Sequence, residues 1–199
     1  MSRAIVTGDR LFGLAAAYRS AMRVAPSLLL TAATLAGTAV AAPPPRPEGA
    51  PATCRYQSSA AFQESTRDLV VGPLVLVGAR EYSPLAATFG GQKYPAVLRA
   101  GHRVTLELPR TVRRTTSLLY ADDEWRLPEG RRTVADGHRV VEFRACPTDR
   151  AESSYRGRSA TFWSGGLLTT VPRCVTLRIW VDDERTPRRA RIPVGKRCA

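Results

Sequence analysis

Four stretches of the chain alternate apolar and polar residues with a period of two, and this pattern restricts the fold more than any other feature of the sequence. They are HRVTLELP (102–109), HRVVEFRA (138–145), CVTLRIWV (174–181) and RARIPVG (189–195). Because successive side chains of a β-strand point to opposite faces, each stretch predicts a strand with one buried face. The residues expected to be buried are Val104, Leu106, Leu108, Val141, Phe143, Ala145, Val175, Leu177, Ile179, Val181, Ala190, Ile192 and Val194.

A fifth stretch, DLVVGPLVLVG (68–78), is apolar on both faces, which is typical of a central strand. A bulge or bend is expected at Gly72 and Pro73, because proline has no amide hydrogen for a sheet ladder. Asp136-Gly137 favours a hairpin turn. No helical pattern follows the first cysteine. The sequence therefore predicts an all-β fold, an antiparallel immunoglobulin-like sandwich of about seven or eight strands.

The first part of the chain has the pattern of an export signal. Residues 24–42 carry no charge and contain the small-x-small cleavage pattern Ala-Val-Ala. We expect residues 1–41 to be a signal peptide with a long n-region, residues 42–53 to be a proline-rich linker, and residues 54–199 to form a disulfide-stabilised β-sandwich. The alternative is a single N-terminal membrane anchor, because the uncharged segment approaches the roughly 20 residues of a spanning helix.

Arginine dominates the charge of the chain. Of 30 basic residues 28 are arginine, and the formal net charge is +13. Four basic residues and one acidic residue precede Ala42, so the exported part carries 26 basic and 16 acidic residues and a charge of +10. This excess favours an anionic partner. The alternative is that high-GC codon usage, which also produces so high a ratio of arginine to lysine, accounts for part of it. For an exported protein, an anionic envelope polymer or an envelope protein is a better candidate than nucleic acid.

Four cysteines follow the apolar segment, at positions 54, 146, 174 and 198. An even number in an exported chain predicts two disulfides, and the sequence allows three pairings. The pairing that we favour joins Cys146 to Cys174 and Cys54 to Cys198, which closes one loop and ties the ends of the domain together. No pair has the C-x-x-C spacing of a zinc site, so no metal site is expected.

The stretch TFWSGGLL (161–168) raises the question of a serine nucleophile. The order W-S-G-G lacks the G-x-S-x-G pattern of a hydrolase elbow, and no helix follows. A nucleophile also needs a base. The two histidines of the chain are the candidates for this base. The alternative function is therefore a secreted serine hydrolase that uses Ser164 with His102 or His138. We favour a bulge or sharp bend at the two glycines, with no catalytic residue.

Two acidic triplets, in LYADDEW and IWVDDER, match at a spacing of sixty residues. Clustered carboxylates are ligands that Ca²⁺ takes, but neither triplet has an EF-hand pattern. An acidic turn that closes a hairpin is the better interpretation, and no cofactor is expected. The residues are Asp122, Asp123, Glu124, Asp182, Asp183 and Glu184.

The binding surface that the sequence favours lies on a predicted hairpin. If residues 174–181 and 188–194 pair through the turn DDERTP, the outward face places arginines beside a tryptophan. Arginine binds phosphate and carboxylate through two parallel hydrogen bonds, and an exposed indole stacks on a sugar or a guanidinium. The alternative is a solvated strand face with the tryptophan covered by arginine stems or by a second sheet. The residues expected to bind the ligand are Arg178, Trp180, Arg189 and Arg191, beside Thr176.

Several short segments resemble a known group of proteins. They are VGPLVLVGAR, CP, TFWSGG, PRCVTL and the terminal GKRC, together with LRAGHRVTLELP, which is similar to the start of a strand in immunoglobulin-like bacterial sandwiches. On these segments the chain resembles a set of uncharacterised secreted actinobacterial proteins. The resemblance implies export and a sandwich fold, and it implies no activity.

The sequence as a whole favours a secreted, non-catalytic β-sandwich that binds an anionic envelope component or an envelope protein. This interpretation depends on the export pattern, the four cysteines, the strand pattern and the lack of a catalytic constellation. The alternatives are the secreted hydrolase and a purely structural envelope protein.

Overall fold

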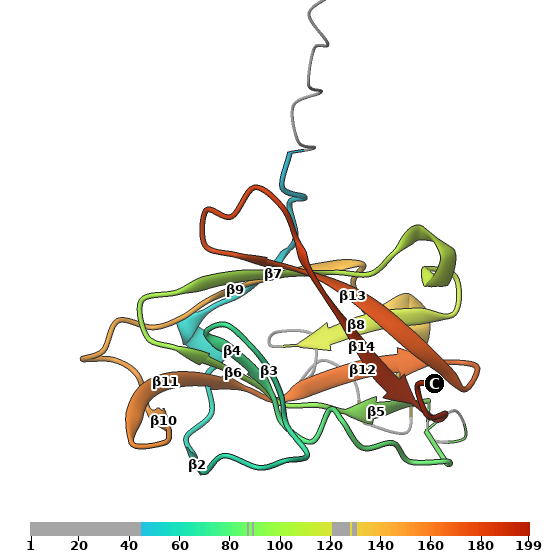
Figure 1. Ribbon diagram of the computed structural model, residues 1–199, viewed down its shortest axis with the longest axis horizontal. Coiled ribbons are helices and arrows are strands. Elements are labelled where there is room, and N and C mark those ends of the chain that lie inside the picture. Colours follow the sequence, from blue (N-terminus) through green and yellow to red (C-terminus); the bar gives the residue numbers. More distant parts are fainter. Residues whose placement is uncertain (1–44, 87, 89, 121–127, 129–130) are drawn as a thin grey trace, which may run out of the picture. The chain divides into compact units, whose positions relative to one another are not determined.

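The computed structural model describes residues 45–86, 88, 90–120, 128 and 131–199, which form three β-sheets (Figure 1). Sheet A has the order β1 (Ala50–Ala52), β9 (Val140–Arg144), β7 (Arg103–Glu107), β13 (Arg173–Val181), β14 (Arg188–Val194). Sheet B has the order β2 (Ala61–Phe62), β10 (Ser153–Tyr155), β11 (Arg158–Trp163), β6 (Ala96–Arg99), β4 (Leu74–Leu76), β3 (Leu69–Val71). Sheet C has the order β5 (Gly91–Lys93), β12 (Gly165–Thr169), β8 (Thr116–Tyr120).

Helical structure is limited to short 3-10 turns in the described residues. They are η1 (Cys54–Tyr56), η2 (Arg110–Val112) and η5 (Val134–Asp136). No helix of the described part of the chain is long and apolar enough to cross a membrane. The expected signal peptide, or anchor, lies outside the described residues.

The prediction of an all-β fold is confirmed, but the prediction that all strands are antiparallel is wrong. β1 runs parallel to β9, and β2 runs parallel to β10. Each of these early strands is added to an edge of its sheet, and no short hairpin fixes its direction. The described residues form fourteen strands instead of seven or eight, because the run 68–78 gives two strands and several short strands, such as β1, β2, β5 and β10, lie outside the predicted runs.

The main core lies between sheet A on one side and sheets B and C on the other (Figure 1). The alternation predicted for the strands of sheet A is confirmed, since every residue expected to be buried is buried apart from Ala145, which is half-buried. Three aromatic rings join the three sheets. Phe143 of sheet A packs edge-on against Trp163 of sheet B and against Tyr120 of sheet C, and the distances between the ring centres are 5.2 Å and 5.0 Å.

Ser164 lies at the corner where one long strand pair leaves sheet B and enters sheet C. β11 pairs with β6 and β12 pairs with β5, and the two pairings have the same offset. When this offset is continued across the corner, Ser164 stands opposite Pro95. Proline cannot donate to the ladder, so the pairing is interrupted there. Gly165 follows with a φ of 149°, and a Cβ at this position would lie 2.3 Å from the carbonyl oxygen of Leu119. The bend that the sequence predicts at the two glycines is therefore present.

Two other predicted turns differ from the expectation. Gly72 and Pro73 close a tight hairpin between β3 and β4, so the chain reverses there instead of bending within one strand. Gly72 has a φ of 62°, which glycine adopts without strain. The hairpin expected at Asp136-Gly137 is absent, because Asp136 ends a 3-10 turn that a capping box with Thr133 closes.

The four cysteines form two disulfides, as predicted, but the bonds are Cys54–Cys146 and Cys174–Cys198. The favoured pairing of Cys146 with Cys174 and of Cys54 with Cys198 is therefore wrong. β1 and β9 run parallel, so the cysteines that follow these two strands leave the sheet side by side. The other bond forms because the chain turns back after β14 at Gly195, which bridges to the start of β13.

Candidate anion-binding face

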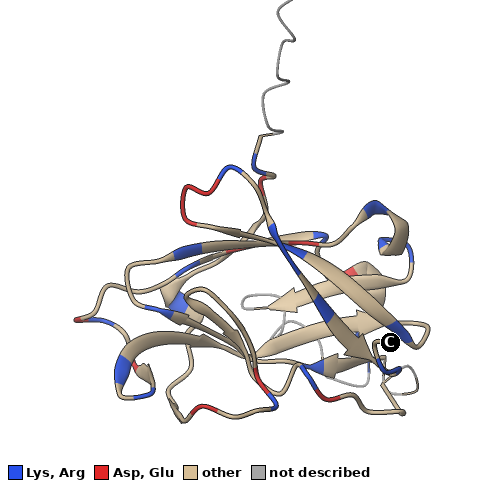
Figure 2. Cartoon of the chain, in the orientation of Figure 1, with Lys and Arg blue, Asp and Glu red and all other residues tan. Residues whose placement is uncertain are grey.

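The hairpin predicted for β13 and β14 is present, and residues 182–187 connect its strands. Arg178 stands directly opposite Arg189, and Thr176 stands opposite Arg191. All four side chains are exposed on the outward side of sheet A. We call Arg178, Arg189 and Arg191 the arginine face. Figure 2 shows basic residues along β14, the edge strand of this sheet.

Trp180 is not exposed, so the prediction that it belongs to the ligand-binding surface is wrong. Only 3% of the residue is accessible, and its indole N–H donates to Oε2 of Glu107 at 3.4 Å. Arg46 contacts the same part of the sheet, because it donates to Oγ1 of Thr105 at 2.9 Å and to the carbonyl oxygen of Trp180 at 2.9 Å. The folded region therefore begins before Cys54, and the segment expected to be a linker takes part in sheet A.

Glu107 is a buried carboxylate that engages part of the arginine face. The residue is 7% exposed, Arg113 donates to its Oε1 at 3.0 Å, and Nη1 of Arg178 lies 3.6 Å from the same oxygen. A carboxylate without water requires such partners, because the loss of hydration is costly. Arg178 therefore stabilises the buried carboxylate of Glu107 and also places a positive charge on the surface.

Arg189 and Arg191 are the members of the arginine face that remain available to a ligand. Arg191 donates to the main-chain oxygen of Ala199, the last residue of the sequence, and Arg189 has no ion pair or side-chain hydrogen bond in the part of the chain that the structure describes. Arg178 and Arg189 are cross-strand neighbours, and like charges in this arrangement repel each other. A bound anion would screen this repulsion and accept paired hydrogen bonds from the guanidinium groups.

An open pocket of about 740 Å³ adjoins the arginine face at the edge of β14. We call it the edge pocket, and it is lined by Arg80, Glu81, Tyr82, Arg191, Pro193, Arg197 and Cys198. The guanidinium of Arg197 lies 5.6 Å from the centre of the Tyr82 ring, a cation–π contact that orients it. Glu81 is already paired with Arg67 at 3.0 Å. The arginines of the edge pocket thus extend the positive surface beyond the hairpin.

The structure joins His102 to an acid that the sequence spacing did not indicate. Nδ1 of His102 lies 2.8 Å from Oδ2 of Asp182, which is 80 residues away in the chain, and the backbone N–H of Arg103 donates to Oδ1 at 2.9 Å. Arg46 donates to the carbonyl oxygen of Asp182. Burial raises the pKa of Asp182, but the hydrogen bonds from Arg103 and His102 and the nearby positive charges outweigh it and hold this pKa below its ordinary value.

Replacing Asp182 by asparagine is expected to lower the free energy of unfolding by about 1 kcal/mol near neutral pH, the upper range for a partly exposed ion pair. Asparagine tolerates the positive φ of 42° at this position, so the charge is the main change. Because the folded-state pKa is depressed, the contribution of Asp182 is present above its unfolded pKa of about 3.9 and is lost as the pH falls through the folded value. Urea unfolding of both proteins should show a difference that shrinks toward acid pH, and a difference independent of pH would contradict the prediction.

The structure does not bring Ser164 to either histidine. His102 precedes β7 of sheet A, whereas Ser164 lies at the corner of sheets B and C, and no hydrogen bond joins them within the described residues. His138 bridges to Leu118 on the side of β8 opposite to β12, the strand that follows Ser164. A serine nucleophile requires its base within hydrogen-bond reach, so this geometry does not support the proposed serine–histidine arrangement.

The acidic triplet at 182–184 closes the hairpin of β13 and β14, and its carboxylates have basic partners. Besides the histidine pair described above, Asp183 accepts a hydrogen bond from Arg103 at 3.2 Å, and Glu184 accepts one from Arg188 at 3.0 Å. Among the described residues there is no group of three or more side chains that could hold a metal ion. Outside the described residues lie Asp122, Asp123 and Glu124.

Comparison with known proteins adds no relative from which a role for these residues could be transferred. No protein-family model, curated protein or solved structure matches the chain. The assignment of a function therefore depends on the geometry of the arginine face and the edge pocket.

Proposed function

We propose that the protein is an exported, non-catalytic β-sandwich module that binds an anionic polymer of the cell envelope. The arginine face is the binding surface, and the edge pocket receives part of the ligand. The observation that carries this proposal is the exposure of Arg189 and Arg191, neither of them paired with an Asp or Glu side chain among the described residues, next to a pocket that contains Arg80 and Arg197. An acidic surface of an envelope protein is the alternative partner.

The linear arrangement of the arginines favours a polymer over a single anion. Alternate residues of a strand recur about every 6.8 Å, so Arg189 and Arg191 form a row along the edge strand of sheet A. The edge pocket adds Arg197, oriented by Tyr82, at one end of this row. A chain with repeated phosphate or carboxylate groups offers several acceptors at once, and each guanidinium binds one of them bidentately.

The disulfides support a site of action outside the cytosol. Both bonds are formed, and the described residues contain no free cysteine. Disulfides persist in oxidising compartments and are rare in the cytosol. An exported arginine-rich surface meets envelope polymers and envelope proteins before it meets any nucleic acid.

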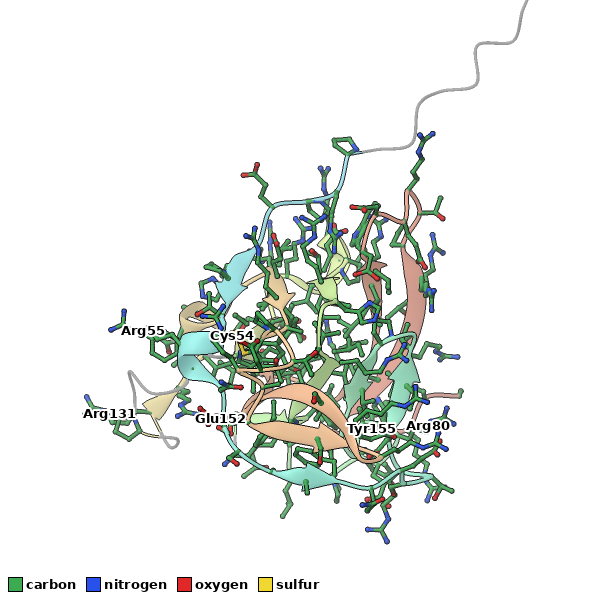
Figure 3. The ribbon with its side chains drawn as sticks, turned by 90° about the vertical axis from the view of Figure 1, so that its left-hand side faces the viewer. Cys54, Arg55, Arg80, Arg131, Glu152 and Tyr155 are labelled. Carbon is green, nitrogen blue, oxygen red and sulfur yellow. A yellow bond between two sulfur atoms is a disulfide. The ribbon has the colours of Figure 1, made fainter. Side chains whose placement is uncertain are left out.

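The double substitution R189Q/R191Q is expected to weaken binding to a polyphosphate chain about tenfold at low ionic strength, which corresponds to about 1.4 kcal/mol. Each substitution removes a charged donor without leaving a buried carboxylate unpaired. The matched control is R55Q/R150Q, which removes the same charge from exposed residues elsewhere. Figure 3 shows Arg55 on the opposite side of the view from Arg80 of the edge pocket. Titration calorimetry with polyphosphate, repeated with polyglutamate, measures the dissociation constants.

An equal loss of affinity in both double variants would contradict the proposal, because net charge alone would then attract the polymer. The absence of saturable binding by the unchanged protein would contradict it as well and would favour a purely structural envelope role. Saturable binding to an acidic envelope protein, but to neither polymer, would assign the surface to the alternative partner.

A further inference from the structure

A second pocket lies on sheet B, which does not carry the arginine face. Its volume is about 350 Å³, at the small end of the roughly 300–1,000 Å³ typical of ligand pockets. The hairpin of β3 and β4, the end of β6 and the hairpin of β10 and β11 form its walls, and Figure 3 labels Tyr155 of the last hairpin. We call it the sheet B pocket, and it is lined by Val70, Gly72, Pro73, Val75, Arg99, Tyr155, Arg156 and Arg158.

The floor of the sheet B pocket is apolar, because the outward side of this sheet has a hydrophobic cluster of its own. The cluster is separate from the main core and consists of Val75, Val97, Tyr155 and Ala160, with Phe62, Val77 and Phe162 packed against it. Val70 lies opposite Val75 on the neighbouring strand and is 44% exposed. An exposed valine that continues an apolar floor is a surface that an apolar ligand group would cover.

Arginines surround this apolar floor. A two-residue turn with positive φ values of 53° at Arg156 and 71° at Gly157 connects β10 to β11 and brings Arg156 and Arg158 to the pocket. Arg156 is paired with Glu64 at 3.0 Å. The guanidinium groups of Arg99 and Arg158 have no ion pair and no hydrogen bond with any residue that the structure describes. Two unpaired cations beside an apolar floor favour a ligand that is both anionic and apolar.

Tyr155 contributes a buried hydroxyl that lacks a hydrogen-bond partner within the described residues. The residue is 7% exposed. Burial, together with the charges of Asp68 and Glu64, raises the pKa of this hydroxyl, so it stays protonated and is a donor at neutral pH. Buried polar groups are nearly always hydrogen-bonded, and an unpaired donor at the wall of a pocket therefore indicates a missing acceptor.

We propose that the sheet B pocket binds a small amphiphilic anion, a phosphate or carboxylate attached to a short apolar chain. The anionic group accepts hydrogen bonds from Arg99, Arg158 and the hydroxyl of Tyr155, and the apolar chain covers Val70 and Val75. The lining residues of this pocket and those of the arginine face do not overlap. The two proposals therefore fail or succeed independently.

The test is calorimetric titration of the full chain with hexyl phosphate, with inorganic phosphate and hexyl glucoside as matched controls. Hexyl phosphate is expected to bind at one site, at least about tenfold more tightly than either control, because only this probe uses both the arginines and the apolar floor. R99Q/R158Q should lower its affinity about tenfold, and the charge-matched control R55Q/R150Q, on exposed residues outside both pockets, should leave it unchanged. Tyr155→Phe keeps the ring in the floor and should weaken binding about threefold through the loss of the hydroxyl.

Equal affinity for inorganic phosphate would overturn the proposal, because the apolar floor would then contribute nothing. Equal affinity for hexyl glucoside would overturn the proposal, because the arginines would then contribute nothing. An equal loss in R55Q/R150Q would overturn it as well, because the attraction would then be non-specific. Co-sedimentation with phosphatidic acid vesicles separates two sources of such a ligand. If the protein sediments with the vesicles and R99Q/R158Q does not, the ligand is a membrane lipid. If the protein binds hexyl phosphate but does not sediment with the vesicles, the ligand is a free amphiphile.

Discussion

Replacing Cys54 and Cys146 together by alanine is expected to lower the free energy of unfolding by about 4.5 kcal/mol. A disulfide restricts the unfolded chain, and in the loop-entropy model the effect grows with the length of the closed loop. Cys54 and Cys146 are 92 residues apart, whereas Cys174 and Cys198 are 24 apart, for which the same model gives about 3.5 kcal/mol. The first bond also holds the short edge strand β1 against β9.

The matched control for this change is the double alanine variant of Cys174 and Cys198. Urea unfolding of both variants measures the free energies, and the loss should be about 1 kcal/mol larger for the Cys54–Cys146 pair. Alanine leaves no unpaired thiol that could exchange with the remaining bond. An equal or smaller loss for the Cys54–Cys146 pair would contradict the prediction, because the longer closed loop would then give no greater stabilisation.

Replacing Gly165 by alanine is expected to lower the free energy of unfolding by about 3 kcal/mol or more, from overpacking together with a strained backbone. The added Cβ would lie 2.3 Å from the carbonyl oxygen of Leu119 and 2.4 Å from a ring carbon of Tyr120. Its φ of 149° is also one that L-residues rarely adopt. β12 lies between β5 and β8, so the chain has little room to move away.

Two variants isolate the cause of this effect. Gly101 has a φ of 80° but no atom within 4 Å of an added Cβ, so Gly101→Ala reports the backbone strain alone, about 1 kcal/mol. Ser164→Ala leaves the corner intact and should change stability by less than about 0.5 kcal/mol. Thermal unfolding ranks the three variants. A loss in Ser164→Ala as large as that in Gly165→Ala would show that the serine, and not the glycine, holds the corner.

The strand faces of sheet A were predictable because the alternation of residue types directly reflects burial. Leu177 lies between Thr176 and Arg178, so the alternation alone places it in the core, and no knowledge of the rest of the chain is needed to see it. The bend at Ser164 was predictable for a similar local reason, since two adjacent glycines allow backbone positions that other residues avoid. Its cause, Pro95 on the facing strand, depends on a register that the sequence does not reveal.

The disulfide pairing was not predictable, because it depends on a strand with no pattern of its own. Ala50–Ala52 contains a proline and no large apolar side chain, yet it forms an edge strand beside β9. Proline is tolerated at a sheet edge, where its missing donor can face away from the ladder. Once β1 runs parallel to β9, the meeting of Cys54 and Cys146 follows directly.

The candidate site was predictable in part. Periodicity correctly places Arg178, Arg189 and Arg191 on an exposed face, and it also places Trp180 on the outward side of the sheet. The burial of Trp180 depends on Glu107, a strand away, and on Arg46, which lies 134 residues earlier in the chain. Contacts of such long range leave no periodic signal, and the pairing of His102 with Asp182 was missed for the same reason.

The edge pocket also escaped the sequence, because it assembles three distant segments. Arg80 and Tyr82 follow β4, Arg191 lies on β14, and Arg197 belongs to the C-terminal segment. The Cys174–Cys198 disulfide fixes that last segment beside the hairpin. Three arginines that are far apart in the sequence, Arg80, Arg191 and Arg197, are therefore brought to one pocket by the fold.

The most direct test of anion binding by the arginine face is an NMR titration that follows the Nε–Hε signals of individual arginines as polyphosphate is added at low ionic strength. We predict saturable shifts for Arg189, Arg191 and Arg197, and no saturable shift for Arg55 and Arg150. Small shifts of similar size at all five arginines, without saturation, would contradict the proposed function, because the positive charge of the whole protein would then be the only attraction.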